Sequence, residues 1–126
     1  MKLRIRGDSL RLRVTQAELN RIGEGEVVSE SIRFAHDSVL CYQLSTSVEA
    51  TKVVARFQGN TVDVYLPPSI AESWVETEQV GIKGEQDIGD GAMLSLLIEK
   101  DFACLQPRPG EDESDMFANP DAGDTC

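Results

Sequence analysis

The stretch Arg6-Gly7-Asp8-Ser9-Leu10-Arg11-Leu12-Arg13-Val14-Thr15-Gln16-Ala17-Glu18-Leu19-Asn20-Arg21-Ile22-Gly23 decides the fold, because a degraded copy of its first half recurs 52 residues later. Gly7-Asp8-Ser9-Leu10 aligns with Gly59-Asn60-Thr61-Val62, and the helix start at Thr15 aligns with Pro67-Pro68. The chain therefore contains one structural unit twice.

Each copy begins with a β-hairpin pattern. Apolar and polar residues alternate on both sides of a two-residue turn, Gly7-Asp8 in the first copy and Gly59-Asn60 in the second. The turn sets the register of both hairpins. The predicted opposite pairs are Arg6 with Ser9, Ile5 with Leu10 and Leu3 with Leu12, then Phe57 with Val62, Ala55 with Val64 and Val53 with Leu66.

A short helix follows each hairpin. Thr15 and Glu18 form a capping-box pattern that starts a helix over 15–22, and Gly23 suits its end. In the second copy we expect a helix over 68–76, with Ser69 and Glu72 as a second possible cap. Trp74 lies on the apolar stripe of this helix, so we assign it to the core.

Further strands are predicted near residues 26–34, 39–44, 80–85 and 93–98. The last of these has contiguous apolar residues, so we expect it to be central and buried on both faces. The order ββαββ is thus repeated. We predict a mainly β, pseudo-duplicated ββαββ barrel with two short helices, formed by one domain over 1–105 with repeats at about 1–46 and 51–100. A monomer and a dimer that exchanges hairpins are both compatible with the pattern.

Charge is unevenly distributed. The net charge of −10 divides into +2 for residues 1–33, −7 for 34–105 and −5 for 106–126. The last segment is rich in Pro, Gly and acidic residues, and we predict a flexible acidic tail. The tail is either a solubilising segment or a docking segment anchored by the apolar pair Met116 and Phe117. A strongly acidic chain opposes nonspecific binding to nucleic acid.

The outer face of the first hairpin is basic. The predicted register places Arg4 beside Arg11 and Lys2 beside Arg13, with Arg6 nearby, and like charges opposite one another are unfavourable. We therefore predict an anion- or partner-binding face formed by Lys2, Arg4, Arg6, Arg11 and Arg13. Candidate anions are the protein's own acidic tail, acidic side chains of residues 34–105, a partner protein and a nucleic-acid backbone.

Two resemblances follow from these motifs. The run from Arg6 to Leu19, continuing to Gly25-Glu26-Val27, resembles the swapped-hairpin module of AbrB-type regulators and MazE-type antitoxins. That resemblance implies a cradle-loop barrel and DNA binding through Arg6, Arg11 and Arg13. The runs 2–6, 9–13 and 99–105 are similar to a family of small bacterial proteins of unknown function, which implies no activity.

Catalytic and metal signatures are weak. The sequence has one histidine and three cysteines without paired spacing, so we predict no metal site and no cofactor. Cys104 with His36, or Glu99 with Asp101, are the catalytic alternatives.

No run resembles a membrane span or a signal peptide, and we expect a cytoplasmic protein with reduced thiols. The favoured function is a non-catalytic protein-interaction or regulatory module; the alternative is an AbrB/MazE-like DNA-binding regulator that uses the basic hairpin.

Overall fold

The computed structural model describes residues 1–102, which form eight strands and two helices. The strands are β1 (Lys2–Ile5), β2 (Ser9–Val14), β3 (Val28–Ala35), β4 (Ser38–Thr46), β5 (Val54–Gln58), β6 (Thr61–Leu66), β7 (Gly81–Gly89) and β8 (Ala92–Lys100). The helices are α1 (Gln16–Gly23) and α2 (Pro68–Glu76). The prediction of a mainly β protein with a repeated ββαββ order is confirmed.

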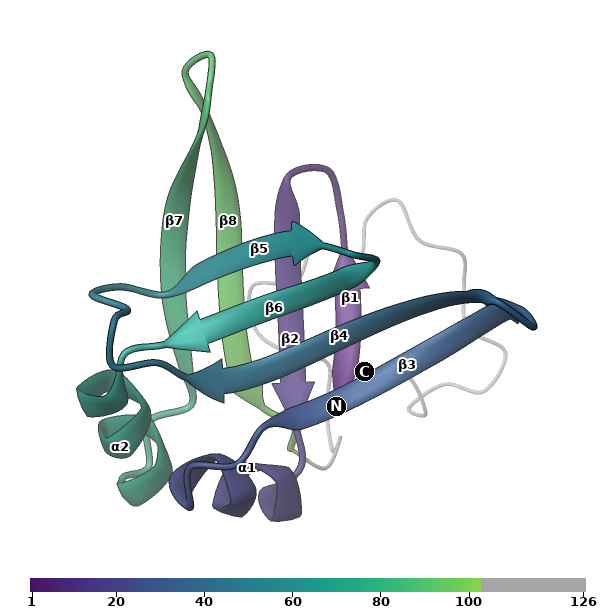
Figure 1. Cartoon of the computed structure of the whole chain (residues 1–126). Helices are drawn as coiled ribbons and strands as arrows, with labels where there is room; N and C mark the ends of the chain where they lie inside the picture. Colours follow the sequence, from purple (N-terminus) through teal and green to yellow (C-terminus); the bar gives the residue numbers. More distant parts are fainter. Residues whose placement is uncertain (103–126) are drawn as a thin grey trace, which may run out of the picture.

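Each sheet combines strands from both repeats. Sheet 1 has the order β1-β2-β8-β7, and sheet 2 has the order β3-β4-β6-β5. The hairpin β1–β2 of the first repeat thus joins the hairpin β7–β8 of the second, while β5–β6 joins β3–β4 (Figure 1). The joining pairs, β2 with β8 and β4 with β6, are parallel. The two repeats therefore exchange hairpins within one chain.

The two repeats are related by an internal two-fold symmetry, and the cross-strand residue pairs of one repeat match those of the other. Lys2 opposite Arg13 matches Val54 opposite Tyr65, a shift of 52 residues. Val28 opposite Leu44 matches Ile82 opposite Ile98, a shift of 54 residues. Even the register irregularity recurs, between Arg33 and Ala35 in β3 and between Asp87 and Gly89 in β7. The second repeat therefore contains two extra residues between its helix and its second hairpin.

The predicted barrel is not closed. The chain forms two separate four-stranded sheets whose strands cross one another (Figure 1), and no ladder of the described residues joins an edge of one sheet to an edge of the other. Packing of crossed sheets brings only their central strands into full contact. The edge strands β5 and β7 approach each other at one corner, and β1 and β3 lie at the opposite corner.

The predicted hairpin registers are confirmed with one exception. The pairs Ile5–Leu10, Leu3–Leu12, Phe57–Val62 and Ala55–Val64 are present, and the Arg6 amide donates to Ser9 O at 3.0 Å. Val53 does not pair with Leu66, because β5 begins only at Val54. Val53 is nevertheless buried, and it packs in the core. The second hairpin of each repeat is longer than predicted, since β4, β7 and β8 each span nine residues.

The two helix starts differ. The Thr15 side chain accepts from the Glu18 amide and Glu18 accepts from the Thr15 amide, so the predicted capping box is confirmed. The second predicted cap is wrong: α2 begins after Pro67 without a side-chain cap, and Ser69 lies inside the helix. Pro68 at the first helical position removes one amide that a cap would satisfy and presets the backbone angle φ.

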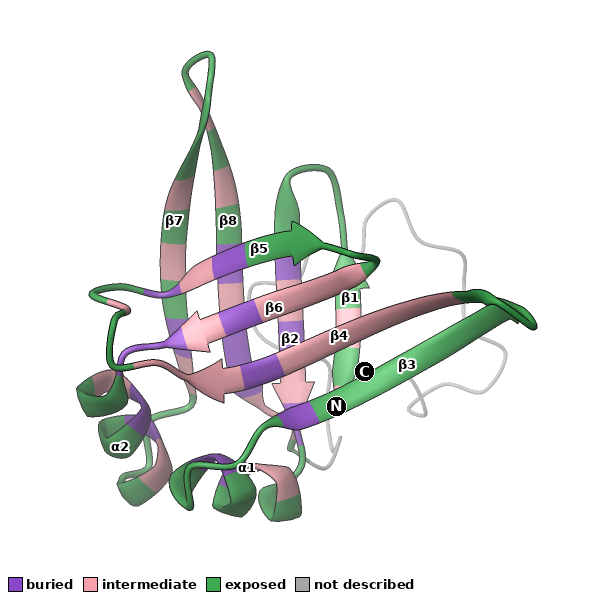
Figure 2. Cartoon of the chain, in the orientation of Figure 1, coloured by how far each residue is buried: buried purple, intermediate pink, exposed green. Residues whose placement is uncertain are grey.

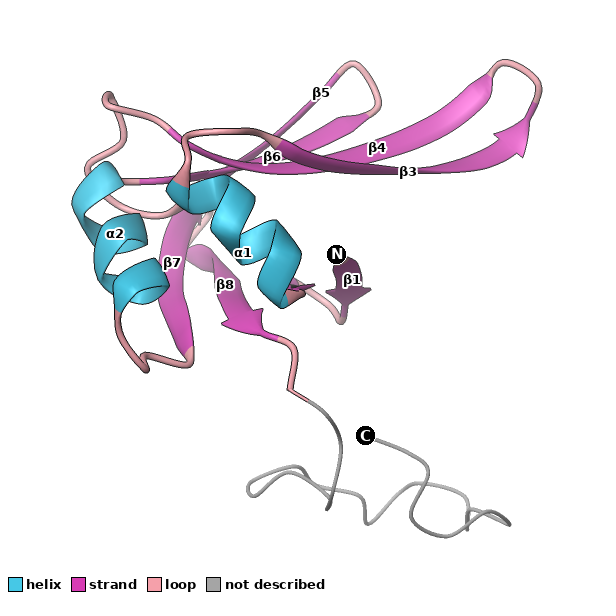
Figure 3. Ribbon diagram, turned by 90° about the horizontal axis from the view of Figure 1, so that it is seen from below, coloured by secondary structure: helices cyan, strands magenta, loops and turns pink. Residues whose placement is uncertain are grey.

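The core lies between the sheets and under the helices (Figures 2 and 3). Trp74 is fully buried as predicted, and its Nε1 donates to Val80 O at 3.1 Å. The helices lie side by side at one end of the molecule, where a Cβ on Gly23 would stand 2.9 Å from Val75 Cγ1. β8 is central in its sheet. Leu96 and Ile98 are buried on one face of β8, whereas Leu97 on the other face is only half-buried.

One side chain ties the sheets together at the corner between β5 and β7. Gln86 accepts from the Ala55 amide at 2.8 Å and donates to the Ala55 carbonyl at 2.9 Å. Nearby, a Cβ on Gly84 would stand 3.1 Å from Val53 Cβ, so a glycine at this position lets the sheets approach closely. Gln86 thus satisfies the backbone of an edge residue of β5 that no strand within residues 1–102 pairs with on that side.

Replacement of this bridge tests its contribution to stability. We expect Gln86→Met to lower the free energy of unfolding by about 1–3 kcal/mol, because both backbone groups of Ala55 lose their partner in a half-buried place. Denaturant unfolding monitored by Trp74 fluorescence measures the change. The exposed Gln58→Met is the control and should stay within about 0.5 kcal/mol. Equal effects of the two substitutions would contradict a bridging role.

The start of α1 carries a pH-sensitive contact. Partial burial alone would raise the pKa of Glu18, but hydrogen bonds from the Met1 amino group and from the Thr15 amide, together with the positive charge of the amino group, hold the pKa below its ordinary value of 4.5. The Met1 nitrogen lies 2.6 Å from Glu18 Oε2. A carboxylate with a lowered pKa stabilises the fold above its unfolded pKa, and this contribution disappears as the pH falls through the folded pKa.

We therefore expect Glu18→Gln to lower the free energy of unfolding by about 1 kcal/mol at neutral pH, since the amide keeps the cap but loses the charge. The difference from the wild type should shrink as the pH falls below 4.5. Denaturant unfolding at a series of pH values measures it. Glu49→Gln in an exposed loop is the control, and a difference between Glu18→Gln and wild type that is independent of pH would refute the electrostatic origin.

Candidate anion-binding face

The predicted basic residues lie together on the outer face of sheet 1. Lys2 and Arg4 come from β1, and Arg6 follows the end of that strand. Arg11 and Arg13 come from β2, and the ladder places Arg4 opposite Arg11 and Lys2 opposite Arg13. These five residues are called the basic face below. Their alternation with Leu3, Leu10, Leu12 and Val14 is what turns them away from the core.

A buried carboxylate lies beside the basic face. The parallel ladder puts Glu99 of β8 next to Arg13 of β2. Glu99 is only 6% exposed, and its Oε1 accepts from the Nε of both Arg11 and Arg13 at 2.7 Å. Charge-assisted bonds of this length compensate the repulsion between neighbouring guanidinium groups. Glu99 of β8 is thus one of the anions that we predicted beside the basic residues.

A second carboxylate lies at the start of β1. Lys2 Nζ is 3.1 Å from Asp101 Oδ2, just past the end of β8. Glu99 and Asp101, the paired carboxylates of the catalytic alternative, both contact side chains of the basic face. Acidic side chains of residues 34–105 were among the candidate anions, and these two contacts are of that kind.

The basic face remains positively charged by formal count. Five cations face two carboxylates, which leaves +3. Arg4 and Arg6 are exposed, and neither forms an ion pair within residues 1–102. A groove of about 260 Å³ runs between the side chains of Lys2, Leu3, Arg4, Arg11 and Arg13. The exposed part of the basic face is thus hollowed and cationic.

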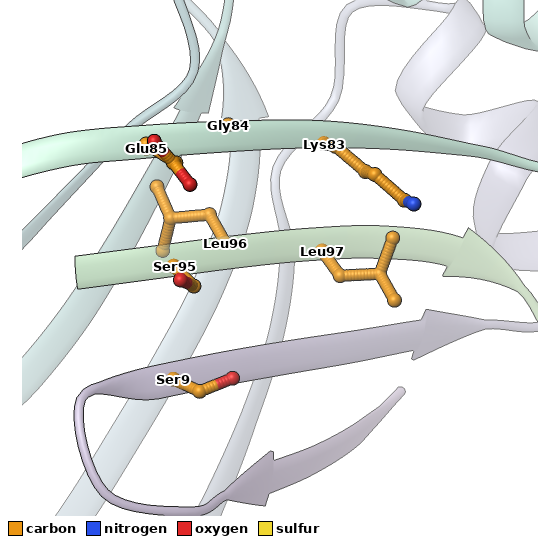
Figure 4. A pocket seen from close by; sticks show the side chains of 7 residues that line it. All are labelled: Ser9, Lys83, Gly84, Glu85, Ser95, Leu96 and Leu97. Atoms are coloured by element: carbon orange, nitrogen blue, oxygen red, sulfur yellow. The ribbon is translucent and has the colours of Figure 1, made fainter. Parts of the chain in front are cut away.

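A second hollow continues the same face towards β7 (Figure 4). It has a volume of about 600 Å³ and is lined by Ser9, Lys83, Gly84, Glu85, Ser95, Leu96 and Leu97. The ladders place Leu97 between Arg11 on β2 and Lys83 on β7. A half-buried leucine flanked by two cations offers an apolar contact within a charged surface.

The equivalent face of sheet 2 has different chemistry. The internal two-fold relation matches Arg11 with Asp63, which lies opposite Arg56 and accepts from Gln43 Nε2 at 2.8 Å. Arg56 lies 5.9 Å from the centre of the Tyr65 ring. The basic character of sheet 1 is therefore particular to one repeat and is not required by the fold.

The other candidate residues are placed as follows. His36 lies in the turn between β3 and β4, and Cys41 is a half-buried thiol of β4. Cys104, Met116 and Phe117 lie outside the described residues, as does the predicted tail 106–126. Within residues 1–102, no group of three or more His, Cys, Asp or Glu side chains is arranged to hold a metal ion.

The role of Glu99 was not predictable from the sequence. Its contacts require knowledge that β8 lies beside β2, and a parallel partner 86 to 88 residues away leaves no local signal. The alternation of Glu99 and Asp101 with Lys100 was the available hint.

Removal of the buried charge tests the arrangement. We expect Glu99→Gln to lower the free energy of unfolding by about 3–5 kcal/mol, because two half-buried guanidinium groups lose the carboxylate between them. Denaturant unfolding measures the loss. Glu85→Gln, an exposed carboxylate on the same face of β7, is the control and should change stability by less than about 0.5 kcal/mol.

The double variant Glu99→Gln with Arg13→Met separates pairing from packing. If Glu99 acts by compensating charge, the second substitution should recover part of the loss. Losses that simply add would show that Glu99 contributes by packing alone.

The comparisons with known proteins give a family and no activity. A search of curated proteins and a search of solved structures gave no match, so they do not confirm the resemblance to AbrB and MazE. Neither helix in the described part of the chain is long and apolar enough to cross a membrane. A family model matches residues 1–121, and the chain belongs to that family, which is described as a family of unknown function (DUF7009).

Proposed function

We propose that the chain is a non-catalytic protein-interaction module whose basic face binds an acidic segment of a partner protein. The observation that carries the proposal is the excess of cations on the basic face, where five cations lie with two carboxylates, and the equivalent face of sheet 2 has no counterpart. A duplicated fold needs neither face to be basic. A charge excess confined to one face favours a ligand of opposite charge.

The shape of the face suits an extended segment. Glu99 fixes the orientation of Arg11 and Arg13 by accepting a hydrogen bond from each. The exposed Arg4 and Arg6 lie further along the same hairpin. Guanidinium groups bind carboxylates through paired hydrogen bonds, so fixed arginines give geometric specificity. The neighbouring hollow at Leu97 would accept one apolar side chain of the ligand.

The chain's own C-terminal residues have the same chemistry. Residues 106–126 carry a net charge of −5, and Met116 and Phe117 lie among their acidic residues. The described chain ends at Phe102, next to the ion pair between Lys2 and Asp101. We include in the proposal that this segment competes with the partner for the basic face, which would regulate binding.

A DNA-binding regulator is the second candidate, favoured by the row of arginines on a hairpin. The net charge of −10 opposes it, because phosphate contacts would have to outweigh repulsion from the remainder of the chain.

Titration with an acidic peptide tests the proposal. A synthetic peptide of residues 106–126 serves as the probe for the full chain, with fluorescence anisotropy as the readout. We expect binding at low salt that weakens as salt rises, and a loss of about tenfold in affinity for Arg4→Ser with Arg6→Ser. The matched control is Arg56→Ser, which removes the equivalent of Arg4 from sheet 2 and should leave the affinity unchanged.

The absence of binding at low salt, or an equal loss in the Arg56→Ser control, would contradict the proposal. Tighter binding of duplex DNA than of the peptide under the same conditions, lost in the same double variant, would favour the DNA-binding alternative.

Neutralising the C-terminal acids in the full chain tests the regulatory part. We expect Glu111→Gln, Asp112→Asn, Glu113→Gln and Asp115→Asn together to increase the affinity for the added peptide several-fold, since the internal competitor is weakened. The neutralised chain should show a smaller salt dependence of amide shifts at Arg4 and Arg6. Unchanged affinity would remove the competition from the proposal and leave the basic face as an open site.

A further inference from the structure

The strand β3 has a long edge that no strand within residues 1–102 pairs with. It is the edge strand of sheet 2, spans eight residues, and is exposed at every residue after Val28. Ile32 and Phe34 are 48% and 71% exposed although both are large and apolar. An uncovered edge of this length and composition is a template for pairing with another strand.

The internal two-fold relation shows what is missing at this edge. Ile32 occupies the position equivalent to Gln86 of β7, whose amide group bonds the edge residue Ala55 of β5. An isoleucine cannot form that bridge to Leu3, which is the equivalent of Ala55 on β1. The corner between β5 and β7 is therefore bridged by Gln86, whereas the corner between β1 and β3 is connected through Met1, whose amino group lies near Glu30 and whose carbonyl accepts from the Tyr42 hydroxyl at 3.2 Å.

The hairpin β3–β4 also extends past sheet 1. The near part of β3 lies close to the start of β1, where the Met1 nitrogen is 3.3 Å from Glu30 Oε1. Two perpendicular views show the far end of the hairpin projecting beyond β1 (Figures 1 and 3). Ile32 and Leu40 are opposite each other in this projecting part, on the same side of the sheet as the buried pair Val28 and Leu44.

We propose that β3 pairs antiparallel with β3 of a second copy of this chain, so that two copies of sheet 2 form one continuous sheet. A second copy fits because antiparallel pairing reverses the strand direction. The projecting apolar end of each chain then lies along the near half of the other, where β3 approaches the start of β1. Each chain supplies both complementary parts, as a two-fold interface requires.

The charges on β3 limit the register. A two-fold axis perpendicular to the sheet places inward side chains of one copy opposite inward side chains of the other. Centring the pair on Glu30 or on Arg33 would put like charges opposite each other, which is unfavourable. Centring it on Ser31 or on Ile32 avoids this, and we assign the Ile32 register because it also places the two exposed isoleucines together.

The pairing differs from the proposed basic-face interaction in its response to salt. Each copy carries a net charge of −10, so copies repel one another at low salt. A dimer held by backbone hydrogen bonds and apolar contacts should therefore strengthen as salt rises. A dimer in which the acidic end of one chain binds the basic face of another should weaken.

Sedimentation of the full chain at low and high micromolar concentration tests the pairing. We expect the mass to approach twice 13.8 kDa as concentration and salt rise. Phe34→Glu should weaken dimerisation by at least about tenfold, because the assigned register places the new carboxylate opposite Glu30 of the second copy. The matched control is Ile88→Glu, the equivalent position of β7, and it should leave the dimer intact.

Ile32→Lys provides a second variant, and circular dichroism checks that each variant folds. Hydrogen exchange of the wild type should show protection of 28–35 that rises with concentration, without a similar rise in 81–89. A monomer at every concentration and salt, equal effects of Phe34→Glu and Ile88→Glu, or a dimer that dissociates with salt would each overturn the pairing. Peptide binding by the basic face should be unaffected by Phe34→Glu, so the two proposals fail independently.

Discussion

The parallel pairs of β2 with β8 and of β4 with β6 are the constraint on which the structure depends. Each hairpin alone is a two-stranded ribbon, which is marginally stable in water. The parallel pairs join a hairpin of one repeat to a hairpin of the other and produce the two four-stranded sheets. The same pairing brings Glu99 beside Arg13, so the chemistry of the basic face follows from the exchange of hairpins.

Local features of the fold were predictable because local physics determines them. Period-two alternation and the Gly-containing turns gave the hairpin registers, and Thr15 with Glu18 gave the start of α1. The parallel partners were not predictable, since strands far apart in sequence carry no mark of which strand they pair with. Closure of the barrel was not predictable for the same reason: strand count and order do not reveal whether the sheet edges meet.

The basic residues of the candidate site were predictable from the sequence, but their carboxylate partners were not. The register placed the five cations on one face and required a compensating anion, but only the fold shows that Glu99 and Asp101 supply part of it. Conversely, the sequence predicted that β3 is a strand but not that its edge is exposed. The exposure of Ile32 and Phe34 depends on how far sheet 1 extends along β3, which only the fold shows. Alternation can identify a face, but it cannot say what covers that face.

The pairing of β2 with β8 also sets the order in which the molecule can be completed during synthesis. Sheet 2 contains only strands up to Leu66, so all four of its strands are available once that residue has left the ribosome. Sheet 1 needs β8, which ends at Lys100. Until β8 has been synthesised, β2 lacks its parallel partner. The basic hairpin is therefore made well before β8, so β2 gains its parallel partner only after sheet 2 can be complete.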